Sequence, residues 1–261
     1  YEGYFNGYTA EHASHLFSVT KSVFSLLIGI AIDQGSIQSV NEPVLAFFGN
    51  YSVKTGETTI QNVAIQHLLT MTAPYKYESE PYEEFFTSPN PIVTALDYLG
   101  GDAPTGAFRY SAIGGTHILS GILTQATGKS ALEFAQERLF APLGIDVPCG
   151  IVLRSAEEHA AVMNDKATRG WVVDPQGNHM ASWGLFLTPR EMAKIGQLVL
   201  NGGMWEGRRI VSEKWIANCT REHSRCYEWG NLAYGYLWWI IDEDSIAALG
   251  ASYMHTPNLD R

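Results

Sequence analysis

The sequence has few basic residues, few cysteines and no long apolar run. Its 261 residues contain 17 Lys and Arg against 27 Asp and Glu, which gives a formal net charge of -10. Nucleic-acid-binding proteins usually gather Lys and Arg on one face, and no run of Lys or Arg occurs here, so we expect no nucleic-acid partner. The longest apolar stretch, 23–32, is far short of the roughly 20 residues that a membrane span needs. No integral membrane segment is visible in the sequence.

The cysteines are too few and too scattered for a disulfide framework or a structural zinc site. They are Cys149, Cys219 and Cys226. We expect free thiols, with a Cys219–Cys226 bridge as the alternative. The spacing of Asp165, Asp174 and His179 matches no metal-ligand template. We therefore expect no metal.

A hydrophobic content of 46% is enough for one large core, and no repeat or linker divides the chain. Strand-like residues lie near both ends. Helical patterns fill the middle, and the expected helices are 18–35, 60–71, 91–99, 113–127, 131–139, 189–201 and 212–219, followed by a buried strand over 234–241. We predict a single α+β domain over 1–261. In this domain a sheet takes strands from both chain ends, an all-helical region is inserted at about 60–200, and a cleft lies at their junction.

Ser18 and Lys21 form a Ser-x-x-Lys pair at the start of the most apolar segment. On a helix this spacing places the hydroxyl and the amine on one face, about one turn apart. A serine hydroxyl is a poor nucleophile at neutral pH, and an amine made less basic by burial can accept its proton. The pair therefore indicates a nucleophile and its base, with the Ser18 N–H as an oxyanion donor. The alternative is an N-cap serine followed by a solvated lysine.

Segments in order along nearly the whole chain resemble the class C beta-lactamase-like family, also called the S12 serine peptidase family, to which penicillin-binding proteins are related. Residues 15–22 are similar to the nucleophile segment of that family. The similarity continues through residues 67–72, 121–144, 183–196, 203–207 and 234–236. The resemblance implies a beta-lactamase/transpeptidase-like fold, an α/β sandwich with an antiparallel sheet flanked by helices. It also implies that Ser18 is the residue that is acylated.

The second motif of the family is Tyr-x-Asn, and the matching segment here is Tyr110-Ser111-Ala112. The resemblance implies that Tyr110 moves protons between the nucleophile, the lysine and the leaving group. We place Ser111 and Ala112 in the substrate-binding part of the site. The side chain of Ala112 cannot hydrogen-bond Lys21 or a substrate amide, so the recognition of amides is in doubt more than acylation is.

The third motif, Lys or His followed by Thr or Gly and then Gly, is not found where the resemblance places it, near Gly250. His255-Thr256-Pro257 resembles it only superficially, because proline removes a strand donor. We expect that on the order of 15 to 20 residues are absent after Gly250, since a sheet without them would expose unpaired edges. We likewise expect that the N-terminal strand and the C-terminal helix of the family are missing from the sequence. Gly250 is placed in the substrate-binding set.

Two further segments are expected near the cleft. Trp183 and Gly184 occupy a loop that borders it in the family, so they are assigned to substrate binding, with packing as the alternative. The aromatic and acidic segment 75–84 could rim the entrance, and a solvated loop is the preferred interpretation.

These features predict a serine hydrolase that forms an acyl-enzyme on a small-molecule substrate and needs no cofactor. The candidate substrates are a beta-lactam, a small ester or a D-amino-acid peptide, and the Ala112 substitution favours a promiscuous esterase or weak beta-lactamase. A penicillin-binding-like binding or regulatory module without turnover is the alternative, and a stable acyl-enzyme lies between the two. The resemblance implies a bacterial protein. The sequence leaves its oligomeric state and its location, cytoplasmic or exported, open.

Overall fold

The computed structural model describes residues 2–242 and 245–250. Its α-helices are α1 (Val19–Asp33), α2 (Ile65–Leu69), α3 (Tyr82–Thr87), α4 (Pro91–Tyr98), α5 (Gly114–Thr127), α6 (Ala131–Ala135), α7 (Ala141–Leu143), α8 (Ala156–Asn164), α9 (Pro189–Leu200) and α10 (Glu213–Cys219). Short turns of other helix types are η1 (Val44–Phe47), η2 (Thr59–Asn62) and η3 (Gln136–Phe140). The strands are β1 (Ser14–His15), β2 (Gly150–Val152), β3 (Gly170–Val173), β4 (Leu185–Leu187), β5 (Met204–Trp205), β6 (Arg208–Arg209), β7 (Ser224–Cys226), β8 (Leu232–Tyr234), β9 (Trp239–Ile240) and β10 (Ile246–Ala247).

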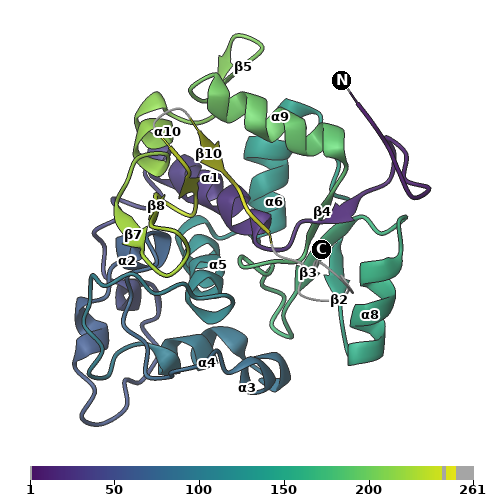
Figure 1. The fold of residues 1–261 in the computed structure, drawn as a ribbon. Helices are drawn as coiled ribbons and strands as arrows, with labels where there is room; N and C mark the ends of the chain where they lie inside the picture. The colour runs from purple at the N-terminus through teal and green to yellow at the C-terminus, as the bar shows by residue number, and fades with distance from the viewer. Residues whose placement is uncertain (1, 243–244, 251–261) are drawn as a thin grey trace.

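Helix α1 runs through the centre of the molecule, between α10 on one side and the sheet of β2, β3 and β4 on the other (Figure 1). Every residue from 20 to 31 is buried, which is expected of a helix that is apolar on all faces. Gly29 allows α10 to approach closely, because a Cβ atom at Gly29 would lie 2.3 Å from Cδ1 of Trp215. The segment that begins with the proposed nucleophile is therefore held rigidly in the core.

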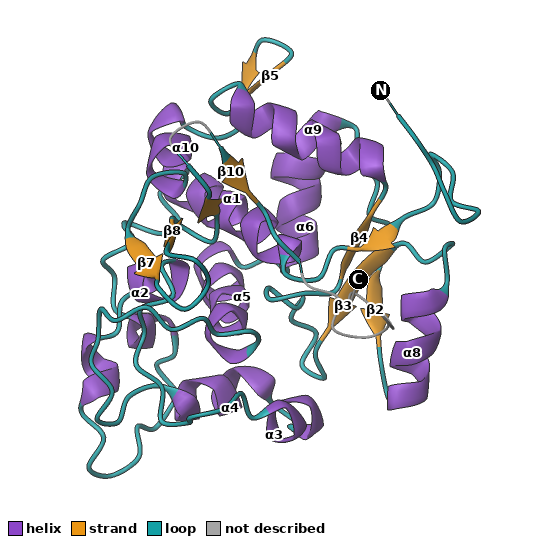
Figure 2. Ribbon diagram, in the orientation of Figure 1, coloured by secondary structure: helices purple, strands orange, loops and turns teal. Residues whose placement is uncertain are grey.

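The strands form two sheets of four strands, in the orders β1-β4-β3-β2 and β10-β9-β8-β7, and a hairpin of β5 and β6 (Figure 2). All described pairs are antiparallel except β2 with β3. The predicted α+β class is confirmed. The sheet arrangement differs in detail, since β1 pairs with β4, and the strands near the end of the described chain form a sheet of their own. Strands β2, β3 and β4 also lie within 60–200, so the uninterrupted helical part of that region ends at α7.

Two local predictions were wrong, and two helices were missed. The expected helix 60–71 is broken into η2 and α2 by extended backbone at Val63 and Ala64. The expected strand 234–241 is a hairpin, because Leu237 adopts a φ of 63° and Tyr234 pairs with Trp239. Helices α3 and α8 were not anticipated from the sequence.

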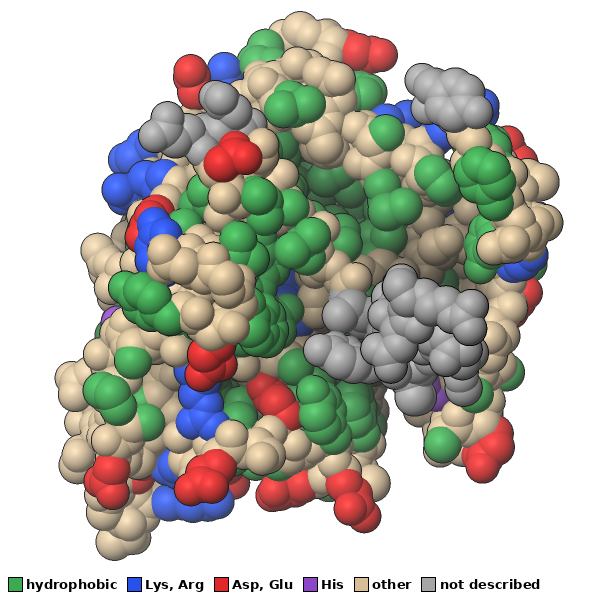
Figure 3. All heavy atoms as spheres, viewed as in Figure 1, with side chains coloured by type: hydrophobic (Ala, Val, Ile, Leu, Met, Phe, Trp, Pro, Cys, Tyr) green, Lys and Arg blue, Asp and Glu red, His purple; other side chains and the backbone are tan. Residues whose placement is uncertain are grey.

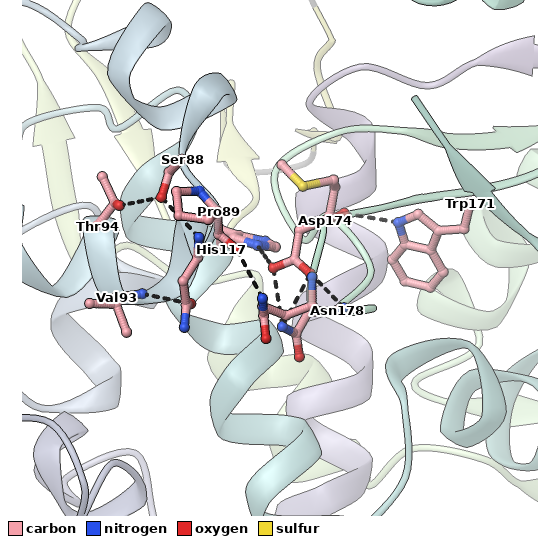
Figure 4. A network of polar contacts seen from close by, with 11 residues as sticks. Ser88, Pro89, Val93, Thr94, His117, Trp171, Asp174 and Asn178 are labelled. Atoms are coloured by element: carbon pink, nitrogen blue, oxygen red, sulfur yellow. Dashed lines mark hydrogen bonds and ion pairs between the residues drawn. The ribbon is translucent and has the colours of Figure 1, made fainter. Parts of the chain in front are cut away.

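A buried polar network joins the helical region to the sheet of β2, β3 and β4 (Figure 4). The imidazole of His117, on α5, lies 3.1 Å from a carboxylate oxygen of Asp174, which follows β3. The side chain of Gln176 donates to the carbonyl oxygen of Pro89, between α3 and α4, over 2.9 Å. Side chains of Asp174 and Asn178 bond each other. Because paired buried groups are costly to separate, this network holds two walls of the cleft in a fixed relation.

Within the part of the chain that the structure describes, no helix has both the length and the apolar character to cross a membrane. Over the same residues, no three His, Cys, Asp or Glu side chains gather as metal ligands would. All three cysteines are free thiols; Cys149 is exposed, while Cys219 and Cys226 are buried.

Candidate active site

Ser18 immediately precedes α1, and the residue before it, Phe17, has a strained backbone conformation. Phe17 has a φ of 47°, a left-handed conformation that is costly for a residue with a side chain and that tends to occur at functional sites. Ser18 stands at the N-cap position, but its side chain makes no capping hydrogen bond. Instead Nζ of Lys21 lies 3.0 Å from its Oγ. The alternative of an N-cap serine beside a solvated lysine is therefore wrong, because Lys21 is only 1% exposed.

Lys21 is surrounded by three oxygen atoms. Besides Ser18 Oγ, its Nζ donates to the carbonyl oxygen of Ala112 over 2.7 Å and to the carbonyl oxygen of Ser182 over 2.9 Å. Burial lowers the pKa of Lys21 to about 7, and the nearby Glu80 carboxylate acts in the opposite direction. A neutral amine keeps two N–H bonds and one lone pair. When both N–H bonds are given to the two carbonyls, the lone pair is left for the Ser18 hydroxyl, which is the arrangement of a general base.

Tyr110 lies next to this pair. The Lys21 amine is 5.3 Å from the centre of the Tyr110 ring, and the ring stacks on Trp239 at a centroid distance of 5.8 Å. Burial raises the pKa of Tyr110 to about 12, while a hydrogen-bonding contact with the Ser18 side chain opposes that rise. The structure therefore brings together the three residues that were predicted to carry the chemistry, from α1 and from the loop that precedes α5.

Ala112 bonds Lys21 in a way that its side chain could not indicate. The side chain cannot hydrogen-bond the lysine, as expected, but the backbone carbonyl of Ala112 does. Ser111, which was assigned to substrate binding, is fully buried; its Oγ accepts a hydrogen bond of 3.0 Å from the N–H of Gly115. It is absent from the described lining of the cleft. Ser111 therefore stabilises the start of α5, next to the site, through the hydrogen bond that its side chain accepts from Gly115.

Gly250 packs directly against the nucleophile segment. A Cβ atom at this position would lie 2.5 Å from the carbonyl oxygen of Leu16 and 3.3 Å from the backbone nitrogen of Ser18. The Ser18 N–H has no hydrogen-bond partner among the described residues. A free N–H group next to a nucleophile can hold an oxyanion. Because Gly250 has no side chain, it leaves space next to the Ser18 N–H.

A cleft of about 700 Å³ opens above Ser18, and hydrophobic side chains gather in the hollow of this face (Figure 3). Within the described residues its lining has no Lys or Arg and is mainly aromatic or aliphatic. The lining residues are His15, Phe17, Ser18, Tyr82, Phe86, Tyr110, Ala112, Ile113, His159, Ser182, Trp183, Trp229, Leu232, Trp239, Leu249 and Gly250. Burial lowers the pKa of both histidines, that of His15 to about 3. Both imidazoles are therefore neutral at neutral pH.

Trp183 lies in this lining, as predicted, with its ring 5.7 Å from that of Phe86 and 5.2 Å from that of His159. Gly184 is absent from the described lining. It has a φ of 92°, and its N–H donates to Nε2 of His15 over 3.0 Å. A Cβ at Gly184 would lie 2.7 Å from Cβ of Val172. Gly184 thus fixes the course of the loop that carries Trp183 and does not touch the cleft itself.

The sequence did not reveal two other groups at the site. One is the carbonyl oxygen of Ser182, which a pattern of side chains cannot show. The other is Glu80, in the segment 75–84 that was expected to be a solvated loop. That expectation holds for most of the segment, which is exposed at 76, 78, 79 and 82–84, and Tyr82 lies in the lining of the cleft. Tyr75 is buried, however, and an oxygen of the half-buried Glu80 carboxylate accepts a hydrogen bond of 2.6 Å from the N–H of Ala112. His255 and the expected gap after Gly250 lie outside the described residues.

A family model described as Beta-lactamase matches residues 1–257 of the chain. A curated relative, the 6-aminohexanoate-dimer hydrolase of Paenarthrobacter ureafaciens, is 28% identical over 240 residues, which are 86% of this chain and 55% of the relative. A second, uncharacterised relative from Alkalihalophilus pseudofirmus is 24% identical and is matched over 60% of its length. The chain therefore spans somewhat more than half of the curated relatives that it matches.

Solved structures show the same fold. A Bacillus anthracis protein proposed to be a 6-aminohexanoate-dimer hydrolase superposes with a TM-score of 0.72 at 21% identity, over 96% of this chain and 65% of that one. The octameric penicillin-binding protein homologue of Pyrococcus abyssi gives a TM-score of 0.64 at 22% identity, over 88% of this chain and 54% of that one. At this level of identity the structural likeness supports the fold alone.

Proposed function

The chain belongs to the beta-lactamase family, and on that premise we propose that it is a serine hydrolase that forms an acyl-enzyme on Ser18. One observation carries this proposal. The buried amine of Lys21 gives hydrogen bonds to two backbone carbonyls and lies 3.0 Å from Ser18 Oγ. Lysine side chains are rarely buried this deeply unless they have polar partners. As a neutral amine in this position, Lys21 can accept the proton of the serine hydroxyl.

The reaction then has two halves. Ser18 Oγ forms a bond to the carbonyl carbon of the substrate as its proton passes to Nζ of Lys21, and the Ser18 N–H stabilises the oxyanion. The bond from that carbon to the leaving group breaks, and the leaving group takes a proton through the Tyr110 hydroxyl. Water next attacks the acyl carbon, loses a proton to the same residues, and releases the acid with the Ser18 hydroxyl restored. No cofactor takes part in these steps.

The lining of the cleft favours an uncharged substrate with apolar groups. Beta-lactams and D-amino-acid peptides carry a carboxylate, and the described lining offers no cation to pair with one. Aromatic side chains form two contacting pairs in this lining, Phe86 with Trp183 and Trp229 with Trp239. Apolar burial stabilises binding by about 25 cal/mol per Å². We therefore propose carboxylic esters with apolar acyl groups as the preferred substrates.

The test follows acylation and turnover separately. The chain, Ser18→Ala and the control Ser52→Ala, an exposed serine, are incubated with p-nitrophenyl butyrate or a fluorescent penicillin. Intact-protein mass spectrometry reports the adduct, and absorbance reports released nitrophenol. The proposal expects ester turnover in the chain and in the Ser52 variant and none in the Ser18 variant, with slower reaction of penicillin. A folded chain with neither adduct nor turnover would favour a binding module, and an adduct without turnover would show a stable acyl-enzyme.

A further inference from the structure

The backbone of Ala112 is hydrogen-bonded on both sides to ionisable side chains. Its N–H donates to Oε1 of Glu80 over 2.6 Å, and its carbonyl oxygen accepts from Nζ of Lys21 over 2.7 Å. Hydrogen bonds with an ionised partner are shorter and about twice as strong as neutral ones. One residue of backbone thus connects a carboxylate to the amine that faces Ser18. Nothing in the proposed reaction uses Glu80.

Burial raises the pKa of Glu80, while the hydrogen bonds from Ala112 and Tyr77 and the nearby Lys21 favour its ionised form. Its Oε1 also accepts from the hydroxyl of Tyr77 over 3.2 Å, whereas its Oε2 is buried and has no hydrogen-bond partner among the described residues. A buried carboxylate oxygen without a partner is unfavourable unless a positive charge lies near. The electrostatic interaction of Glu80 with Lys21 supplies that charge.

The remaining titratable groups around Glu80 are mostly phenols. Arg109 lies over the rings of Tyr75 and Tyr77, at 5.9 and 4.8 Å from their centroids, and donates to the backbone carbonyls of both residues. Burial raises the pKa values of four tyrosines and the charge of Glu80 adds to each rise: Tyr75, Tyr77, Tyr98 and Tyr110. Glu80 is the charged group whose electrostatic interaction raises the pKa of Lys21, against the effect of burial.

We propose that Glu80 is a positioning residue of the Ser18–Lys21 pair: its carboxylate fixes the Ala112 backbone that holds the amine, and its negative charge acts on that amine. This role rests on the proposed function of Ser18 and Lys21. It has two separable parts. The hydrogen bond keeps the Ala112 carbonyl aimed at Nζ, and the charge favours the protonated form of Lys21. Removal of the charge therefore lets Lys21 lose its proton at lower pH.

Three variants separate these parts. Glu80→Gln keeps an oxygen acceptor for the Ala112 N–H and removes the charge. Glu80→Asp keeps the charge on a shorter side chain, and Glu80→Ala removes both. Glu83→Gln, an exposed residue on α3, is the control for loss of one negative charge. Thermal unfolding confirms that each variant is folded before it is compared.

The first readout does not depend on turnover. The titration of Lys21 is followed by NMR in protein labelled with ¹³C at lysine Cε, and its signal is assigned by its loss in Lys21→Met. We expect a lower titration midpoint in Glu80→Gln, with the wild-type midpoint nearly retained in Glu80→Asp and Glu83→Gln. An unchanged midpoint in Glu80→Gln would overturn the proposal. A shifted midpoint in a chain that hydrolyses no ester would support the action of Glu80 on Lys21 and count against the hydrolase instead.

The second readout is the pH profile of ester hydrolysis. The acid limb of kcat/KM should move to lower pH in Glu80→Gln, in step with the NMR midpoint. In Glu80→Ala, kcat/KM should fall by about 10- to 100-fold, since a hydrogen bond to a charged group is lost and the Ala112 backbone is released. A purely structural glutamate would lower activity in both variants without moving the acid limb, and that result would contradict the assigned role.

Discussion

The carbonyl oxygen of Ala112 lies 2.7 Å from Nζ of Lys21, although the two residues are 91 positions apart in the sequence. The motif of the family has asparagine at position 112, and the loss of that side chain suggested a weakened site. The contact shows that the backbone of residue 112 itself hydrogen-bonds the lysine. Ala112 lies in the lining of the cleft, and it brings no charged or hydrogen-bonding side chain to it.

This contact predicts how Ala112→Asn behaves. Because the bond to Lys21 is made by the backbone, turnover of p-nitrophenyl butyrate should stay close to that of the wild type. The new amide adds a hydrogen-bonding group in the cleft, so acylation by a penicillin should become faster. Stopped-flow acylation rates with both substrates measure the effect. A loss of ester turnover by more than about tenfold, worth about 1.4 kcal/mol, would mean that the apolar side chain itself matters.

A second prediction concerns the stability cost of Lys21. Burial lowers its pKa from 10.5 to about 7, so between these pH values the unfolded chain binds a proton at this residue that the folded chain does not. Stability then rises with pH across that window, because the unfolded state holds more protons. Lys21→Met should be more stable than the wild type at pH 7, and the difference should shrink toward pH 10.5.

Urea unfolding of both proteins at several pH values tests this. Lys54→Met, at an exposed lysine that pairs with Asp97, is the control for the loss of one positive charge. The same Lys21 variant should have lost ester turnover by about 10²- to 10⁴-fold, the usual contribution of a general base. Equal stability of the Lys21 variant and the wild type at every pH would show that the amine is not held neutral.

The sequence was sufficient to place the proposed nucleophile beside its proposed base. Ser18 and Lys21 are three residues apart on one helix, and helical geometry alone places them together. The partners of Lys21 could not be found in this way, because the carbonyl oxygens of Ala112 and Ser182 come from 91 and 161 residues away. Every residue has a carbonyl group, so no residue type marks these two.

Dependence on distant parts of the chain also explains why other sequence predictions were wrong. The aromatic segment 234–241 has the composition of a buried strand, and only the positive φ of Leu237 turns it into a hairpin. Glu80 was interpreted as solvated because acidic residues surround it in the sequence. Its burial follows from packing against the Tyr110–Ala112 loop, which tertiary structure brings to it. Local patterns thus predicted several of the helices and the Ser18–Lys21 pair, while the supporting contacts depend on distant backbone.

Gly250 provides a third prediction. The methyl group of Gly250→Ala would lie 2.5 Å from the Leu16 carbonyl oxygen, so the backbone around the nucleophile must shift. A displacement of about 1 Å near reacting groups can lower the rate by about 100-fold. We expect kcat for p-nitrophenyl butyrate to fall by that order. Gly49→Ala is the matched control, since a Cβ there meets nothing within 4 Å. Full activity of the Gly250 variant would remove this residue from the proposed site.

The last prediction tests the apolar wall of the cleft. The ring of Trp183 contacts those of Phe86, His15 and His159, and its removal in Trp183→Ala exposes the acyl group to water. For p-nitrophenyl esters of longer acids, KM should rise by about 5- to 30-fold, equivalent to 1–2 kcal/mol of lost apolar contact. For the acetate ester KM should change little, because its acyl group is too short to reach that wall. Since Ser18 and Lys21 do not touch Trp183 in the contacts above, kcat should be nearly unchanged. Trp205→Ala, in β5 and away from the cleft, is the control, and an equal change in KM for short and long esters would show that Trp183 supports the fold and not the substrate.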